Sequence, residues 1–439
     1  MVTLIDLLSS TYAPIQTMIL PYLGVAEVMA LTRTSKGFDC LLPVLKATAW
    51  NINYRLQAFF TDPLQFRSIL GKSGGLITGT FPRRFLSRSC VPCDSIELCM
   101  NGGSDWGDLA EYLSSEGYDK LDEDSWECTK TDARGRTMLV NFLGSGRSAI
   151  ASIFGNAITT ADLNIITWNK VYSLYPYNTF IKKESFLLQE LDEEVVGYLT
   201  DMAEEDLKSG TVSWNQRKVS YHTFSSCGYK DTDRMTRRRR IGDISSWTMD
   251  LDVEGVRTSG ISDAVIESTT FRLIAPWKWH QNWEVSTYQL DYDEALRHPV
   301  LKYQYVTLAE DQRDMSGIIL DDSQYRKRAS HYARRCQELE ERLDELTLLE
   351  LTKIPSAKRP PEFARLSAGD YSIREASTTR GNFTLPTTWT FYDEEVIAFL
   401  AEAWAEQQIL DERDQAKYRA RYIEQAEKEQ TDRLNDIWN

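Results

Sequence analysis

The chain has 439 residues, a net charge of −15 and 42% hydrophobic residues. Its length predicts two or three domains, and its hydrophobic content excludes wholesale disorder. The acidic balance argues against nucleic acid and against an anionic membrane surface as partners, because phosphate contacts require clustered Lys and Arg.

The sequence also indicates where the protein resides. No apolar run reaches the length of a transmembrane helix, and the short apolar stretch at residues 1–8 lacks the basic residues of a signal peptide. The seven cysteines are sparse and unevenly spaced, which is typical of free thiols in a reducing compartment. We therefore expect no membrane association and a cytoplasmic or nuclear location.

Residues 1–58 are poor in charge and carry apolar residues at intervals of three and four. This spacing predicts three short helices, around residues 14–23, 28–31 and 41–50. Helices with so little polar surface must either pack on the rest of the chain or present an apolar face to a partner.

The same segment resembles an F-box, a module in which three short helices dock on a Skp-type adaptor and so join a cullin ubiquitin ligase. The resemblance is carried by Ala13-Pro14-Ile15, by ILPYL at 19–23, by VAEVMAL at 25–31 and by Thr34-Ser35-Lys36. It implies an adaptor-binding face made of Pro14, Ile15, Leu20, Leu23, Val28 and Leu31. The alternative is a helical cap on the following domain.

Helices and strands are expected to alternate through residues 59–275. The pattern predicts helices at 62–70, 81–87 and 108–116 and strands at 76–78 and 96–100. Residues 148–154 and 162–167 are expected to form a helix or strand pair, and a helix is expected to follow Leu187 as far as about Leu207. Mixed elements of this kind indicate the α+β class.

This block is similar to a group of fungal proteins that couple an F-box-like N-terminus to a nucleotidyltransferase-like domain. The similar segments are FFTDP at 59–63, GLITGT at 75–80, DSIEL at 94–98, YLSSEGY at 112–118, LNIITW at 163–168, YSLYP at 172–176 and RRIGD at 239–243. The resemblance implies three parts: an F-box-like helical module at 1–58, a mixed-sheet nucleotidyltransferase-like domain at 59–275, and a mostly helical extension at 276–439. It implies a fold and not an activity.

The carboxylates needed for nucleotidyl transfer are incomplete. This chemistry requires metal ions held by acids, usually two at positions i and i+2 of one strand with a third on a neighbouring strand. Here Ser95 stands two residues before Glu97, and Asp94 lies three residues before it. The candidate third strand has Asn164 where an acid is needed. We therefore expect no catalytic residues, no bound metal and no cofactor.

The alternative is an enzyme or sensor that binds a magnesium nucleotide. Its pocket would be formed by Gly79, Thr80, Asp94 and Glu97, with Arg239 or Arg240 on the phosphates. The other interpretation of the arginine run at 237–240 is a loop followed by a strand, with arginines that form ion pairs with acidic residues. Asp243 would then hold one of the arginines in place.

Cys90 and Cys93 have the CxxC spacing, but a zinc site would need a second pair or nearby histidines. The first histidine is His222, so ordinary thiols are expected.

The last part of the chain predicts long helices. Residues 325–351 carry a heptad-like seam of Tyr332, Cys336, Leu339, Leu343, Leu346 and Leu349. A proline-rich linker is expected near 353–361, a strand at 383–391 and an acidic helix at 392–439. The long helices could pair within one chain or between chains, which would give a homo-oligomer.

Three functions remain open at this point. The first is an interaction protein built on an inactive nucleotidyltransferase-like fold, acting as an F-box substrate receptor of a cullin ubiquitin ligase. The second is a nucleotide-binding or nucleotidyl-transferring enzyme. The third is a self-assembling structural protein that uses the recruited fold.

Overall fold

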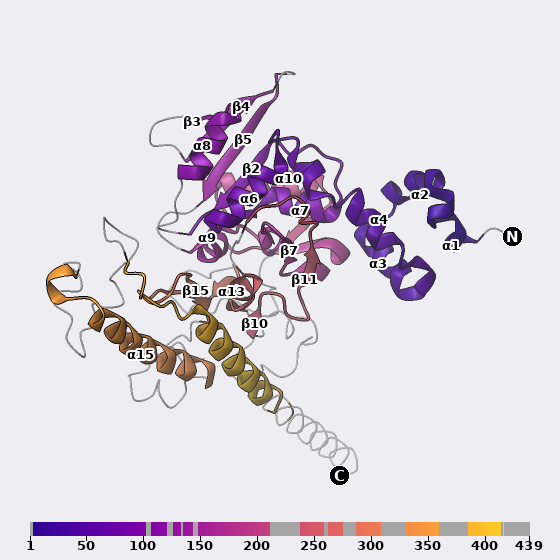
Figure 1. Ribbon diagram of the computed structural model, residues 1–439. Helices are drawn as coiled ribbons and strands as arrows, with labels where there is room; N and C mark the ends of the chain where they lie inside the picture. The colour runs from indigo at the N-terminus through magenta and orange to yellow at the C-terminus, as the bar shows by residue number, and fades with distance from the viewer. Residues whose placement is uncertain are drawn as a thin grey trace, which may run out of the picture. The chain divides into compact units, whose positions relative to one another are not determined.

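The computed structural model describes residues 3–101, 107–120, 126–132, 135–143, 148–210, 238–258, 262–274, 287–308, 331–359, 385–413 and 416. The chain divides into two compact units. Unit 1 comprises Met1–Val212, Arg239–Thr269 and Val285–Leu290, and unit 2 comprises the rest. Figure 1 shows the elements of both units.

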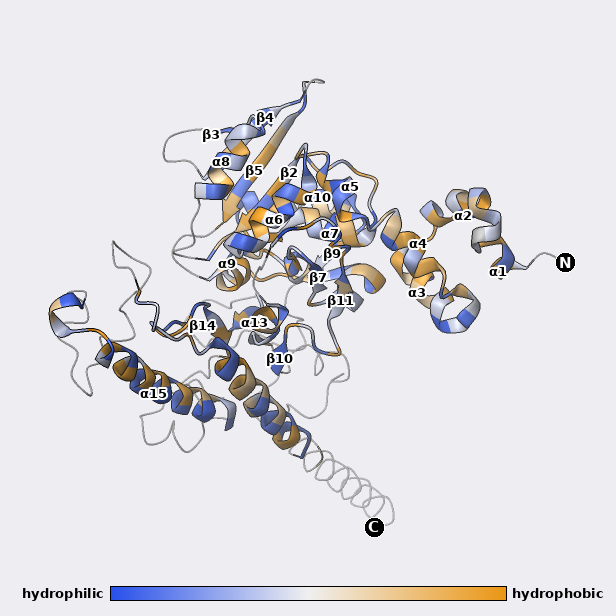
Figure 2. Ribbon diagram, viewed as in Figure 1, coloured by the Kyte–Doolittle hydropathy of each residue, from blue (hydrophilic) through white to orange (hydrophobic). Residues whose placement is uncertain are grey.

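Unit 1 begins with short helices. They are α1 (Leu4–Leu7), α2 (Ala13–Ile19), α3 (Val25–Thr34), α4 (Leu41–Ala47) and α5 (Ile52–Leu56), joined by the 3-10 turns η1 (Ser10–Tyr12), η2 (Leu20–Tyr22) and η3 (Lys36–Phe38). Pro14 occupies the first turn of α2, where its missing N–H costs nothing. Figure 2 shows α3 and α4 as largely apolar, and Val28, Leu41 and Leu45 are buried.

An eight-stranded mixed sheet forms the centre of unit 1. Its order is β11-β7-β6-β1-β2-β5-β4-β3, and only the β2–β5 pair is parallel. The strands are β1 (Leu76–Thr78), β2 (Ser95–Cys99), β3 (Asp119–Lys120), β4 (Glu127–Thr131), β5 (Thr137–Leu143), β6 (Asn164–Ile166), β7 (Lys170–Ser173) and β11 (Trp247–Asp250). The α+β class, with N-terminal helices, a mixed sheet and C-terminal helices, is thus confirmed.

The sheet's register sorts side chains onto two faces. One face of the sheet packs on the main hydrophobic core and carries Ile77, Ile96, Leu98 and Val140. On the opposite face, Thr78 pairs with Glu97 and Glu97 pairs with Asn141, which places these three polar residues in one row.

The remaining elements of unit 1 surround this sheet. They are α6 (Pro63–Ser73), α7 (Thr80–Ser87), α8 (Gly107–Ser115), α9 (Ala149–Asn156), η4 (Thr160–Asp162), the π-helix η5 (Tyr177–Lys182), β8 (Glu184–Phe186), α10 (Glu193–Glu204), β9 (Lys208–Gly210), β10 (Arg238–Arg240) and α13 (Asp263–Glu267). The helix expected after Leu187 begins only at Glu193, because the Asp192 side chain accepts from the Val195 N–H and caps it there.

Unit 2 contains the long helix α15 (His331–Thr352), the turn η6 (Ser356–Lys358), and the strands β12 (Thr270–Ile274), β14 (Asp293–Leu296) and β15 (Tyr305–Thr307). The strand β13 (Gln289–Asp291) begins in unit 1 and ends at the first residue of the next unit 2 segment. Residues 393–413 are also helical. The Tyr332 and Trp404 rings meet edge to face at 5.8 Å, and the Tyr392 hydroxyl donates to Glu350 over 2.9 Å. The start of α15 therefore lies beside the later part of the second helix, so the two helices pair antiparallel within one chain.

The prediction of a strand at 383–391 was wrong for the described residues 385–391, which contain no strand. Their backbone is used by α15 instead: the Thr390 N–H donates to Glu350 over 3.1 Å, and Lys353 donates to the Thr388 carbonyl over 3.1 Å. Of the predicted heptad seam, Tyr332, Leu339 and Leu343 are buried, whereas Leu349 is 54% exposed. Residues 325–330 and 360–361 lie outside the described residues.

Within the described part of the chain, every helix is too short or too polar to cross a membrane.

Candidate functional site

The turn between β1 and α7 brings three of the predicted pocket residues together. Thr78 ends β1, Gly79 adopts a positive φ of 75°, and Thr80 begins α7. Glu97 lies opposite Thr78 on β2. A Cβ atom added to Gly79 would lie 2.3 Å from the Glu97 carboxyl carbon, which is closer than real Cβ atoms approach. The Glu97 carboxylate therefore lies directly against the bare Cα of Gly79, and only glycine fits there.

The carboxylate stands at the N-terminus of α7, where backbone N–H groups and the helix dipole favour negative charge. No side chain of the N-cap residue Gly79 caps this helix, and the Thr80 N–H interacts with Glu97 and lowers its pKa. Burial acts more strongly in the opposite direction and, together with the charge of Asp162, raises the pKa of Glu97 to about 7. Glu97 thus titrates near neutral pH.

Asp162 is the second acid of the site and is buried at the end of η4. Its carboxylate accepts from the Thr159 N–H over 2.8 Å and from the Thr159 hydroxyl over 3.0 Å. The hydroxyl of Tyr198, on α10, donates to its other oxygen. Burial nevertheless raises the pKa of Asp162 above its usual value. Most of its acceptor capacity is committed to neighbours within the protein.

Two arginines of α7 supply positive charge. Arg83, only 4% exposed, forms an ion pair through Nη1 with Glu205, which follows α10. Arg84 binds the other Glu205 oxygen at 2.7 Å. The charge of Arg83 also lowers the pKa of Glu97 and of Asp162. We call the set Arg83, Arg84, Glu97, Asp162, Tyr198 and Glu205 the buried charge cluster.

In this arrangement protein side chains take the places that a phosphate and a metal cation would take in a nucleotide-binding site. Glu97 occupies the helix N-terminus that could receive a phosphate, and Arg83 provides a cation beside the carboxylates. Among the described residues, no three His, Cys, Asp or Glu side chains are grouped so that they could hold a metal ion. What the cluster offers chemically is a proton site near neutral pH.

The other predicted acid and the third strand lie elsewhere. Asp94 is exposed, one residue before β2. The strand that carries Asn164 pairs with β1 and not with β2, and the residue opposite Glu97 on the neighbouring strand β5 is Asn141. The Asn164 amide donates to the Ala161 carbonyl over 2.6 Å. An amide, rather than an acid, therefore stands at the third position by either assignment.

Arg239 and Arg240 are engaged in local structure. Arg239 is buried and donates through Nε and Nη2 to Asp243, over 3.0 and 2.7 Å. Its Nη1 donates to the Leu174 carbonyl. Arg240 donates through Nε to the Glu267 carbonyl. The expectation that Asp243 holds one of these arginines is confirmed, and the arginine is Arg239.

Five members of the cluster escaped the sequence analysis: Arg83, Arg84, Asp162, Tyr198 and Glu205. Only Asp162 leaves a local signal, since Thr159 and Asp162 have the spacing of a capping box. The hydrogen bonds that bring the others together span sequence separations as large as 122 residues. No local pattern encodes such contacts.

The predicted adaptor face is divided between surface and core. Leu20 and Val28 are buried, Leu23 and Leu31 are half-buried, and Pro14 and Ile15 are exposed. Two further apolar residues accompany the exposed pair, namely Met18 at 72% and Tyr22 at 88% exposure.

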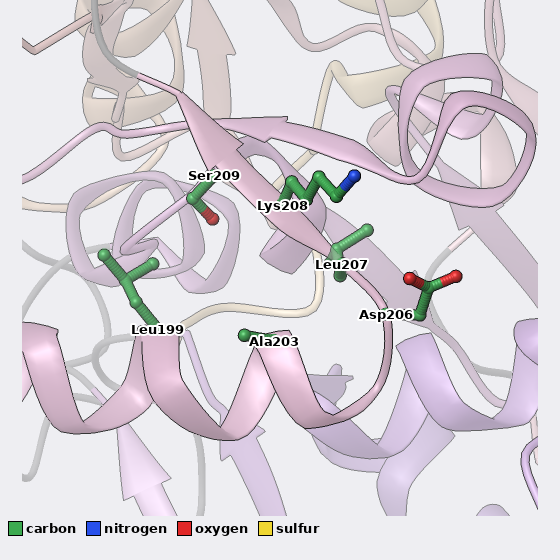
Figure 3. Close-up of a pocket in the computed structure, with 6 residues that line it drawn as sticks. All are labelled: Leu199, Ala203, Asp206, Leu207, Lys208 and Ser209. Carbon is green, nitrogen blue, oxygen red and sulfur yellow. The ribbon is translucent and has the colours of Figure 1, made fainter.

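A pocket of about 370 Å³ lies between α10 and β9. Leu199, Ala203 and Leu207 provide its apolar lining, and Asp206, Lys208 and Ser209 its polar lining (Figure 3). These residues include no member of the buried charge cluster, so the pocket gives a ligand no contact with the cluster.

The CxxC thiols show no metal-binding arrangement among the described residues. Cys90 is exposed, whereas Cys93 donates to the Ser95 carbonyl over 3.1 Å and has a pKa raised by burial.

No family model matches this chain, and no curated protein or solved structure is significantly similar to it. Its fold and site define it as an α+β protein with an eight-stranded mixed sheet and a buried charge cluster at the β1–α7 turn. The resemblances to F-box and nucleotidyltransferase-like proteins stay predictions.

Replacing Gly79 with Ala should lower the free energy of unfolding of unit 1 by about 3 kcal/mol, mainly because residues other than glycine rarely adopt its φ of 75° with a ψ of −143°. The Glu97 carboxylate must also move aside for the new Cβ. Gly117→Ala is the matched control, since Gly117 has a φ of 85° and nothing within 4 Å. It should cost about 1 kcal/mol. Urea unfolding measures both. Equal costs for the two variants would contradict the close approach, and Glu97→Ala should partly rescue Gly79→Ala.

Glu97→Gln should remove a pH dependence of stability. The pKa of Glu97 in the folded state, about 7, lies above its ordinary value of 4.5, so the folded protein binds this proton more tightly. The associated stability is present below pH 4.5 and is lost as pH rises through 7. At pH 8 the variant should be more stable than the parent by about 3 kcal/mol. Asp94→Asn, at an exposed carboxylate, should keep the parental profile in the same urea titrations from pH 5 to 8.

Proposed function

We propose that this chain is a protein-interaction protein built on an inactive nucleotidyltransferase-like fold, with an F-box-like N-terminus that contacts a Skp-type adaptor. In that role it would act as a substrate receptor of a cullin ubiquitin ligase in the cytoplasm or nucleus. The mixed-sheet domain and the C-terminal helices would select the target. The ubiquitin-transfer chemistry would lie in partner enzymes.

The single observation that carries the inactive-core part of this proposal is the position of Glu97. Its carboxylate lies against Gly79 at the N-terminus of α7, where a transferase would hold phosphate. Arg83 places a fixed positive charge beside the same carboxylate. The phosphate of a nucleotide would have to displace the Glu97 carboxylate from the turn. Its metal ion would have to compete with Arg83 for the acids.

Support for the adaptor contact comes from the exposed apolar residues Pro14, Ile15, Met18 and Tyr22. All four lie on α2 and η2, within ten residues of sequence. An apolar group of this size exposed on short helices is typical of a protein-binding surface. Leu20 and Val28 would instead support this surface from below, because they are buried.

Self-assembly through the long helices is less well supported. The α15 seam packs on residues 393–413 of the same chain, through contacts such as Tyr332–Trp404 and His331–Glu406. A second chain would have to replace these contacts or use other surfaces.

The adaptor contact can be tested with the double variant Ile15→Asp/Met18→Asp. Two charges in the exposed group should abolish capture of a purified Skp-type adaptor, because each would be desolvated at the interface. Val196→Asp is the control, since Val196 is 51% exposed on α10. It should bind like the parent, and all three proteins should melt at similar temperatures. An intact parent chain that captures no adaptor would overturn the ligase role.

A second candidate, nucleotide binding, is favoured by one specific observation. Glu97 and Asp162 lie close enough for the charge of one to raise the pKa of the other, so two acids do converge beside the Gly79–Thr80 turn. Two carboxylates can hold a magnesium ion together with the phosphates of a nucleotide. This candidate requires Glu97 to leave the helix N-terminus.

Calorimetry with Mg²⁺ and each nucleoside triphosphate distinguishes the two candidates. With an inactive core, no heat of binding should appear at millimolar ligand for the parent, Glu97→Gln or Asp162→Asn. A saturable isotherm in the parent that disappears in Glu97→Gln would contradict the inactive core and establish the second candidate.

A further inference from the structure

One side chain at the C-terminal end of α7 binds the junction between α2 and α3. Arg88 follows α7 in the left-handed conformation, with a φ of 60°. Its Nη2 donates to the carbonyls of both Leu20 and Leu23, the second over 2.6 Å. These carbonyls belong to η2 and to the residue after it, between α2 and α3. One guanidinium thus binds the junction of the two helices that carry the F-box resemblance.

This contact buries a positive charge. Arg88 is half-buried, and its Nε and Nη1 atoms are buried with no hydrogen-bond partner among the described residues. Its partners are neutral carbonyls, and burial lowers its pKa despite the charge of Glu27 on α3. A partly desolvated cation without a hydrogen-bonded carboxylate is costly. The two charge-assisted hydrogen bonds offset this cost.

The neighbouring contacts divide the N-terminal helices into a fixed base and an outer part. Trp50 donates through Nε1 to the Leu86 carbonyl over 3.2 Å, and Arg55 donates to the Ser89 carbonyl over 2.9 Å. Trp50, Ile52 and Leu56 are all part of the main core. Residues 50–56 therefore have two hydrogen bonds to the end of α7 that do not involve Arg88, and the Arg88 guanidinium also lies over the Trp50 ring, 6.0 Å from its centroid.

The outer part, residues 13–34, contains α2, η2 and α3. Arg88 supplies its hydrogen bonds to the end of α7, and α3 also lies beside η5. Apolar packing opposes release of the outer part, because Leu20, Val25 and Val28 also belong to the main core and α3 packs on η5. Rehydration of the Arg88 charge favours release.

We infer that Arg88 is a releasable clasp: it holds residues 13–34 against the end of α7, and loss of its two hydrogen bonds frees this segment while residues 50–56 stay anchored. The clasp fixes the direction in which Ile15, Met18 and Tyr22 are presented. The clasp does not depend on which molecule binds those residues, so it can be tested separately from the adaptor proposal.

Hydrogen exchange followed by mass spectrometry on the full chain tests the clasp. Arg88→Met keeps most of the side-chain volume and removes the donors. Exchange of amides in residues 13–34 should accelerate about tenfold or more, while amides of β1 and β2 should exchange as in the parent. Arg88→Lys retains a charged donor and should give a smaller increase.

Arg84→Met is the matched control, because Arg84 lies on the same helix and pairs with Glu205. It should leave exchange in residues 13–34 unchanged. The clasp is refuted if Arg88→Met leaves that segment at the parental rate. It is equally refuted if exchange accelerates by the same factor in β1, β2 and residues 50–56, since the residue would then stabilise unit 1 as a whole.

Discussion

The close approach of the Glu97 carboxylate to Gly79 is the constraint on which the site depends. It is possible only because Gly79 has no side chain and adopts a positive φ. It fixes the start of α7 relative to β2, and so places Arg83 one helical turn further on. Arg83 in turn reaches Glu205 beyond α10. The contacts therefore link the central sheet to α7, and α7 to the end of α10.

Helix α7 is short, with eight residues and a length of about 12 Å, yet its two ends serve different parts of unit 1. The N-terminal end belongs to the buried charge cluster. The C-terminal end binds the N-terminal helices through Arg88 and the Leu86 carbonyl. A helix of two turns is stiff over this distance, so the sheet and the N-terminal helices are held in a defined relation by one element.

Sequence reasoning placed the elements of this region well, because the signals are local. Glycines bound the apolar run of β1, a second apolar run identifies β2, and the Asp62 cap with Pro63 identifies the start of α6. Gly79, Thr80 and Glu97 were correctly grouped for the same reason. Asp162 could not be grouped with Glu97 in this way, since the two acids come together only in the folded structure.

The errors also have physical causes. Thr388, Trp389 and Thr390 have strand propensity, but their backbone groups are taken up by Glu350 and Lys353 of unit 2, which tertiary structure alone decides. The nucleotide-binding alternative placed Arg239 or Arg240 on phosphate, whereas the other interpretation paired these arginines with acids. In the structure Arg239 binds Asp243 and Arg240 donates to the Glu267 carbonyl. Spacing in sequence shows which charges are near one another along the chain and not which are already neutralised.

The balance of charge in the cluster depends on the protonation of Glu97. Three carboxylates, Glu97, Asp162 and Glu205, face two guanidiniums, Arg83 and Arg84. This leaves one negative charge in excess, which is costly in a buried setting. The pKa of Glu97, about 7, means that this acid carries a proton roughly half of the time at neutral pH. A proton on Glu97 can therefore complete the neutralisation of the cluster.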